Sequence, residues 1–170
     1  MLHRSLLFVF MLSMTVFTQV PPVEPGVSQT LAKWRAARYS DVRYKLNLKL
    51  EKMSPVLKGT IEIRVKVTSQ AEPPASAGGG TAPAETRPVG NVPPIILDWR
   101  KIKDFEERST INNVIVNGKA VVVSSSPPAN ADGSAFEHNE HLIFRDGVVA
   151  GENVIKLDFT SPLLTSGSAI

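Results

Sequence analysis

The sequence predicts an all-β fold, an antiparallel β-sandwich, and three observations support that prediction. Apolar and polar residues alternate with a period of two through residues 41–53 and again through residues 57–69, as in strands with one buried face. Asn117-Gly118 lies between two runs of β-branched residues, a pattern typical of a tight hairpin. No long helical period follows Tyr39. About seven strands are expected after Tyr39, and antiparallel strands in that number typically form two sheets that pack as a sandwich.

The first two strands are expected to pair as an antiparallel hairpin through a turn at Ser54-Pro55. In each strand, an apolar set is predicted to face the core and the residues between its members to face water. The two sets are Val42, Tyr44, Leu46, Leu48 and Leu50 in the first strand, and Ile61, Ile63, Val65 and Val67 in the second. The Lys, Arg and Glu residues between them form either a binding surface or, as is usual for such alternation, a solvated sheet face.

The later strands follow from shorter alternating runs. In "IILDWR", Ile95, Leu97 and Trp99 fall on one face. In "INNVIVNGKAVVV", a type I′ turn at Asn117-Gly118 is expected, because that turn needs positive φ at both central positions. "HLIFR" and "NVIKLDFT" supply two further strands, and "AGEN", residues 150–153, is expected to be the turn between them.

The chain is predicted to begin with a signal peptide, residues 1–20, followed by a spacer and short helix, residues 21–38. The apolar run in the first segment falls short of the roughly 20 residues that span a bilayer. No stable membrane span is therefore expected, and the protein is predicted to be exported, to the periplasm or the cell exterior. Residues 39–170 are predicted to form the β-sandwich domain, interrupted by a flexible Pro/Gly-rich insert at residues 70–94 that holds little able to pack.

Two interpretations exist for the predicted short helix, in which Leu31, Trp34 and Arg38 recur at helical spacing. In one, the cations Lys33, Arg35 and Arg38 touch a membrane surface. In the other, Trp34 covers one end of the β-core. The second is favoured, because the segment is too short to bind a membrane well.

Composition excludes several classes of site. The chain has no cysteine, which excludes disulfides, a thiolate nucleophile and any zinc site that uses Cys. The formal net charge is +3, but Lys and Arg are interspersed with Asp and Glu, so no nucleic-acid partner is expected. Hydrophobic residues make up 42% of the chain, enough to bury a core.

The stretch "FEHNEHLIF" places His138 and His141 among acidic residues, as a metal site would. Its H-N-E-H differs from the H-E-x-x-H of zinc peptidases, and the neighbouring Phe, Leu and Ile favour a strand. On a strand, positions i and i+3 point to opposite faces. A turn at Asn139 would change that geometry, so a metal site stays open as a minor alternative to the polar end of a core strand led by Leu142 and Phe144.

No other catalytic pattern is present. Ser124 and Ser161 lie outside any G-x-S-x-G context, and there is no glycine-rich phosphate-binding motif. We therefore assign no catalytic, cofactor-binding or metal-ligating residue in this chain.

Several segments in order, "RAARYSDVRYKLNLKLE", "LKGTIEIRVKV", "IILDWR", "INNVIVNG" and "GVVAGENVIKLDFTSPLL", resemble the N-terminal domain of zinc aminopeptidases of the aminopeptidase N type. The resemblance implies a saddle-like β-sandwich that precedes a thermolysin-like catalytic domain. In that family, zinc is held in the catalytic domain by H-E-x-x-H and a more distant Glu, and a G-x-M-E-N loop confers exopeptidase activity. This sequence contains none of these motifs, and its "AGEN" lacks the Met of the exopeptidase loop.

The resemblance implies a non-catalytic N-terminal structural domain of an exported zinc aminopeptidase, incomplete at its C-terminus. Its partner would be its own catalytic domain, and it would meet peptide substrates only as part of the full-length enzyme. The alternative is a free-standing secreted β-sandwich that binds a protein or glycan through its sheet face or insert. A third, weaker hypothesis is a zinc-binding hydrolase built on His138 and His141. If strands are missing, the strand around residues 155–159 or its neighbour should lie at an open sheet edge and promote aggregation.

Overall fold

A computed structural model describes residues 20–69, 92–125 and 135–164, and these contain one α-helix, one turn of 3-10 helix and nine strands. Nearly all of the predicted signal peptide and nearly all of the predicted insert lie outside the described residues. The elements are α1 (Gln29–Ala36), β1 (Tyr39–Lys49), β2 (Val56–Val67), β3 (Ile95–Asp98), η1 (Glu106–Arg108), β4 (Thr110–Val116), β5 (Lys119–Ala120), β6 (Val123–Ser124), β7 (Ala135–His138), β8 (His141–Phe144) and β9 (Gly151–Pro162).

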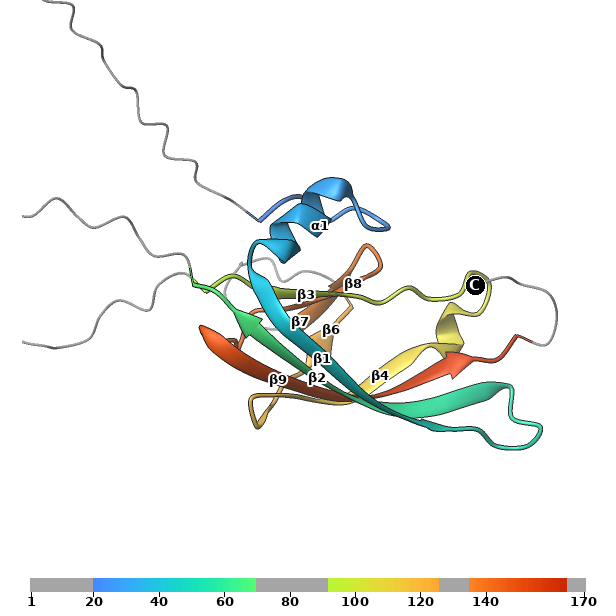
Figure 1. Ribbon diagram of the computed structural model, residues 1–170. Coiled ribbons are helices and arrows are strands. Elements are labelled where there is room, and N and C mark those ends of the chain that lie inside the picture. The colour runs from blue at the N-terminus through green and yellow to red at the C-terminus, as the bar shows by residue number, and fades with distance from the viewer. Residues whose placement is uncertain (1–19, 70–91, 126–134, 165–170) are drawn as a thin grey trace, which may run out of the picture.

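The strands form two open sheets that face each other as in a β-sandwich (Figure 1), which confirms the predicted fold class. The five-stranded sheet has the order β1-β2-β9-β4-β5, and the four-stranded sheet has the order β3-β8-β7-β6. Strand pairing is antiparallel except between β6 and β7, which run parallel over two residue pairs. The smaller sheet is therefore mixed rather than purely antiparallel.

Both hairpins predicted from the sequence are present. β1 and β2 pair antiparallel, with Tyr44 opposite Ile63 and Leu46 opposite Ile61. β4 and β5 are joined through Asn117 (φ 49°) and Gly118 (φ 82°). Positive φ at both positions is what a type I′ turn requires, and its twist matches that of the strands it joins.

Two predictions about the last strand are wrong. β9 begins at Gly151, so Gly151 and Asn153 belong to the strand, and the connection from β8 lies before them. β9 also lies at the centre of the five-stranded sheet, between β2 and β4, rather than at its edge. The chain crosses from the smaller sheet to the larger one after β8, and chain order alone cannot show where the returning strand inserts.

The main core lies between the two sheets, and a smaller cluster lies beneath α1. The main cluster contains Ile63, Val65, Val67, Ile95, Val114, Val116, Ala135, Leu142, Phe144, Ile155 and Leu157. The second contains Leu31, Trp34, Ile96, Phe136 and Ile143. Ser28 caps α1, because its Oγ accepts a hydrogen bond from the Leu31 backbone N–H at 3.2 Å.

Candidate functional site

The stretch "FEHNEHLIF" is a β-hairpin, with the turn at Asn139 that the sequence left open as an alternative to a continuous strand. Asn139 (φ 47°) and Glu140 (φ 64°) form its two-residue turn. His138 and His141 are consequently paired directly across β7 and β8, rather than pointing to opposite faces. Leu142 and the residues that follow it in β8 are buried, as predicted.

His141 is held by polar groups on both sides of its ring, and its side chain is 1% exposed. Nδ1 lies 2.6 Å from the Asn139 carbonyl oxygen, which can only accept, so Nδ1 carries a proton. Nε2 lies 3.2 Å from Asp98 Oδ1, close enough for an ion pair in a protonated ring but without hydrogen-bond geometry. The same Asp98 oxygen accepts a hydrogen bond from Arg35 Nη2 at 2.8 Å. Asp98 therefore links the hairpin to α1.

The turn of this hairpin also holds the entry of the chain. Asn139 Nδ2 donates to the Val23 carbonyl at 2.8 Å, and Glu140 Oε2 accepts from the Gly26 backbone N–H at 2.9 Å. Among the described residues, no three His, Asp or Glu side chains are grouped so that they could hold a metal ion. The polar residues of this stretch make structural contacts in the described fold.

The N-terminal helix covers one end of the core, as predicted. Trp34 is buried, and its ring contacts Tyr39 edge-on with a centroid distance of 5.8 Å. The buried Arg38 guanidinium stacks over the Trp34 ring at 4.6 Å. Arg35 pairs with Asp98, so two of the three cations considered for a membrane patch have partners within the fold. Within the described part of the chain, no helix is long and apolar enough to cross a membrane.

The apolar face of β1 is exposed, and the prediction that it is buried is wrong. Tyr44, Leu46 and Leu48 lie opposite residues of β2 that face the core, so they are on the inner face of the sheet. They are nevertheless 63%, 50% and 52% exposed. The reason is strand length. β1 and β2 have 11 and 12 residues, whereas β3, β7 and β8 have four each, and Figure 1 shows the β1–β2 hairpin extending past the smaller sheet.

An apolar cleft of about 530 Å³ opens between β1 and β3. We call it the edge cleft, and it is lined by Arg35, Ala36, Tyr39, Val42, Tyr44, Ile61, Ile63, Val65, Ile95, Ile96, Leu97, Asp98, Trp99, Leu142, Leu157 and Phe159. Trp99 and Phe159 meet edge-on in it, with ring centroids 6.3 Å apart. The buried Nε1–H of Trp99 has no hydrogen-bond partner within the described residues. A contiguous apolar surface of this kind marks an interaction site in soluble proteins.

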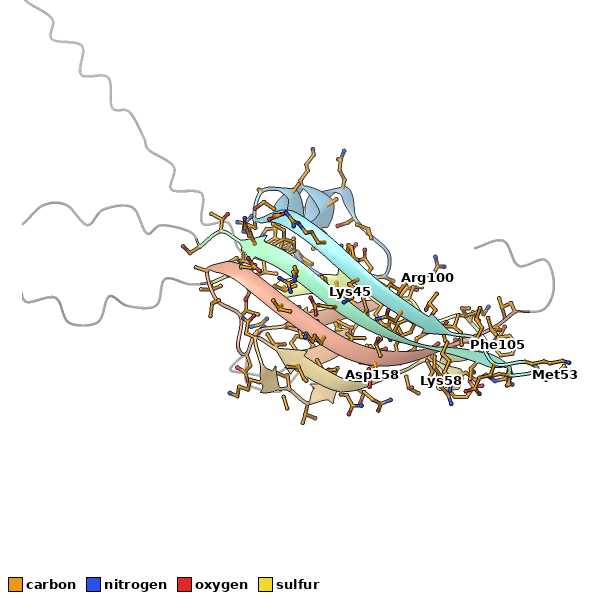
Figure 2. All side chains as sticks on the ribbon, turned by 60° about the horizontal axis from the view of Figure 1, so that its bottom comes forward. Lys45, Met53, Lys58, Arg100, Phe105 and Asp158 are labelled. Carbon is orange, nitrogen blue, oxygen red and sulfur yellow. The ribbon has the colours of Figure 1, made fainter. Side chains whose placement is uncertain are left out.

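The opposite, outer face of the five-stranded sheet is charged (Figure 2). Arg43 lies opposite Arg64 and Lys49 opposite Lys58 across β1 and β2, and like charges in such positions repel. Carboxylates offset part of this repulsion. Hydrogen bonds from Arg64 and Lys156 lower the pKa of Glu62, and hydrogen bonds from Lys66 and Arg43 lower that of Asp41.

Asn153 is, like His141, a buried polar side chain, and its burial was not predicted from the sequence. It is fully buried, and its Oδ1 accepts hydrogen bonds from the Val149 N–H and Asn117 Nδ2, both at 2.8 Å. Its Nδ2 donates to the carbonyls of Val149 at 2.7 Å and Gly151 at 3.0 Å. The "AGEN" segment therefore fastens the entry of β9 to the Asn117 turn.

Two signals in the sequence point to features that were left open or missed. Asn139 tolerates positive φ and lies between apolar runs, which favours the turn that was left open, although Glu140 replaces the glycine usual in such turns. The predicted strands also differ greatly in length, and a long strand cannot be covered by a short one. Nothing in the sequence marks the buried role of Asn153.

Comparisons with protein-family models, curated proteins and solved structures find no match.

Proposed function

We propose that this chain is the non-catalytic N-terminal β-domain of an exported zinc aminopeptidase, and that it acts by packing against the catalytic part of that enzyme. The observation that carries the proposal is the exposed apolar face of β1 beside the edge cleft, because such a surface is normally covered by another protein segment. The aminopeptidase assignment is supported by the order of the sequence motifs. The predicted export is supported by the apolar run near the N-terminus.

In this role the domain supplies shape and contact surface rather than chemistry. Zinc and its ligands would belong to the catalytic part, which removes N-terminal residues from peptides. We assign no catalytic, cofactor-binding or metal-ligating residue to this chain. Peptide substrates would meet it only within the full-length enzyme.

The test is to isolate the native protein with an antibody raised against the β4–β5 hairpin, whose residues 117–120 are exposed and lie outside the edge cleft, and to identify the polypeptide by mass spectrometry. We expect peptides from a region that contains H-E-x-x-H in the same polypeptide, together with chelator-sensitive release of N-terminal amino acids. The control is the purified chain of 170 residues, which should release none. A captured polypeptide that lacks this motif and this activity would contradict the proposal.

A second candidate is a free-standing secreted module that binds a protein or glycan. It is favoured by a hollow of about 340 Å³ on the outer sheet face, lined mainly by charged, amide and hydroxyl side chains. In this hollow, Asn113 Nδ2 donates to Asp158 Oδ2 at 2.7 Å. Sugar rings commonly stack on aromatic side chains, and the lining contains none, so we prefer the first candidate. Glycan-array binding that is lost in Asn113→Ala would reverse that preference.

A further inference from the structure

The free edge of β1 differs from the free edge of β3 across the edge cleft. At β3, the Tyr39 hydroxyl donates to the Pro94 carbonyl at 2.6 Å and accepts from the Ile96 N–H at 3.0 Å. These backbone groups are thereby blocked to an added strand. In the described part of the chain, β1 pairs only with β2. Every second residue of β1 therefore directs its N–H and C=O away from the sheet, where a further strand would bind.

The usable part of this edge is residues 43–49. The register with β2 shifts between Ser40 and Arg43, and Asp41 has a φ of 50°, so a bulge ends regular pairing on that side. Seven residues remain in continuous register with β2, a length typical of strands. Apolar side chains of an added strand would reach the exposed Tyr44, Leu46 and Leu48.

The charges of β1 select the polar side chains that such a strand would carry. Arg43, Lys45 and Lys49 alternate with the apolar set on the outer face. Arg43 pairs with Asp41 and Lys49 with Glu51, but among the described residues no ion pair holds Lys45. Opposite charges directly across two strands stabilise their pairing. The outward residues of the added strand should therefore be acidic.

The same charges disfavour a second copy of this chain. Antiparallel pairing of two β1 strands about Leu46 would align their apolar sets on one face. It would also place Arg43 opposite Lys49 of the second copy, twice over by symmetry. Like charges in these positions repel, and little solvent-exposed carboxylate lies on β1 to offset them.

We propose that the free edge of β1 binds an extended polypeptide segment in which apolar and acidic residues alternate. The segment adds as a further strand to the five-stranded sheet, its apolar side chains enter the edge cleft, and its carboxylates face Arg43, Lys45 and Lys49. This names the surface and the kind of segment used in the domain contact of the proposed function, and so rests on it.

The experiment measures binding of a fluorescein-labelled peptide of about eight residues, in which Val and Glu alternate, to the complete chain by fluorescence anisotropy. We expect saturable binding that is about tenfold weaker for a peptide of the same composition with Val and Glu in separate blocks. Hydrogen exchange should show new protection in residues 43–49. Equal binding of both peptides, or protection elsewhere only, would overturn the assignment.

Variants of the chain test separately the apolar contacts and the charge pairing by which β1 would recognise the peptide. Leu46→Glu, on the exposed apolar face of β1, should weaken binding about tenfold, whereas Val122→Glu, at an exposed apolar residue outside β1 and outside the cleft, should leave it unchanged. The double variant Arg43→Glu with Lys45→Glu should prefer a peptide in which Val and Lys alternate. Failure of that reversal would show that charge does not select the partner.

A dimer in sedimentation velocity that Leu46→Glu dissolves would show that a second copy occupies the edge instead, and would also overturn the assignment. The peptide-binding experiment and the antibody experiment can fail independently of each other. The antibody experiment can identify an aminopeptidase whose catalytic part contacts this domain elsewhere. Conversely, the peptide can bind to β1 in a protein of another family.

Discussion

At the residue scale, two buried polar side chains hold chain connections in place, whereas the lysines and arginines on the outer face of the five-stranded sheet are exposed. His141 and Asn153 are both fully enclosed, and each holds a chain connection in place through its hydrogen bonds. A buried polar group without such partners would cost free energy, so Asn153 is stabilising only because its bonds are made, whereas His141 makes one bond through Nδ1 and its Nε2 has no hydrogen bond among the described residues. The sequence placed His141 at the polar end of a core strand and Asn153 in a turn, and it did not predict their burial, because burial depends on chain segments distant in sequence.

Asn153→Ala is expected to lower the free energy of unfolding by about 2–4 kcal/mol, because it removes buried bonds and leaves backbone groups of Val149 and Gly151 unsatisfied. Chemical denaturation measures the change. The matched control is Asn112→Ala, at an exposed asparagine of the same sheet, which should change stability by less than about 0.5 kcal/mol. Similar losses in the two variants would contradict the role given to Asn153.

Tyr39 should make the fold sensitive to alkali. Burial raises the pKa of its phenol from 10.0 to about 12. Because the folded-state pKa is higher than the unfolded one, this contribution is complete below pH 10 and is lost as the pH rises to about 12. The loss amounts to about 2–3 kcal/mol. Denaturation of the original chain and of Tyr39→Phe at several alkaline pH values measures it.

Tyr39→Phe should be less stable at neutral pH, since it loses the bonds to Pro94 and Ile96. Between pH 10 and 12, however, its stability should fall less steeply than that of the original chain. Equal slopes would mean that the Tyr39 phenol ionises as easily in the fold as in the unfolded chain.

At the element scale, hairpins were predictable where the turn residues are distinctive. Asn117-Gly118 was recognised because few other dipeptides adopt its two positive φ angles. The β7–β8 hairpin was left open as a turn at Asn139, because Glu140 is an unusual residue for the second turn position. The β1–β2 pairing was also predicted, since long alternation on both sides of a short turn allows little else.

The pairing of β2 with β9 contains a close contact between Gly59 and Phe159, which lie opposite each other. A Cβ atom at Gly59 would come within 2.5 Å of Phe159 Cζ, so the ring would have to leave its contact with Trp99. Gly59→Ala should therefore destabilise the original chain by about 1–2 kcal/mol. In the Phe159→Ala background it should be neutral or stabilising, because Ala is better than Gly in a strand.

A double-mutant cycle on Gly59 and Phe159 measures this coupling by denaturation. A coupling energy near zero would show that the ring does not pack over the glycine. The result matters for the edge cleft, because Phe159 and Trp99 form one of its walls.

At the scale of the whole molecule, the sandwich is open on the side where β1 and β3 face each other. One sheet is longer than the other, so part of its inner face has no opposing layer (Figure 1). Apolar side chains remain exposed on an unpaired edge, which is a common starting point for aggregation. The cations of β1 counter this by repulsion between copies.

The isolated chain should therefore aggregate more readily as salt screens these cations. Light scattering should rise on going from about 0.05 to about 0.5 M NaCl, since the Debye length falls several-fold. Leu46→Thr with Leu48→Thr should suppress the rise while keeping strand propensity. Because both side chains are about half exposed, the thermal midpoint should change little. A monodisperse monomer at both salt concentrations would contradict this prediction.

The fold class, the two strongest hairpins and the alternation within each strand follow from the amino-acid sequence alone. These features depend on residues close together in the chain, through turn geometry and the two-residue period of a strand. Other features depend on the tertiary fold: β9 lies at the sheet centre, Asn153 is buried, and Tyr44, Leu46 and Leu48 are exposed. Whether an inward face is covered depends on which distant strands lie opposite and how far they extend, and no local pattern contains that information.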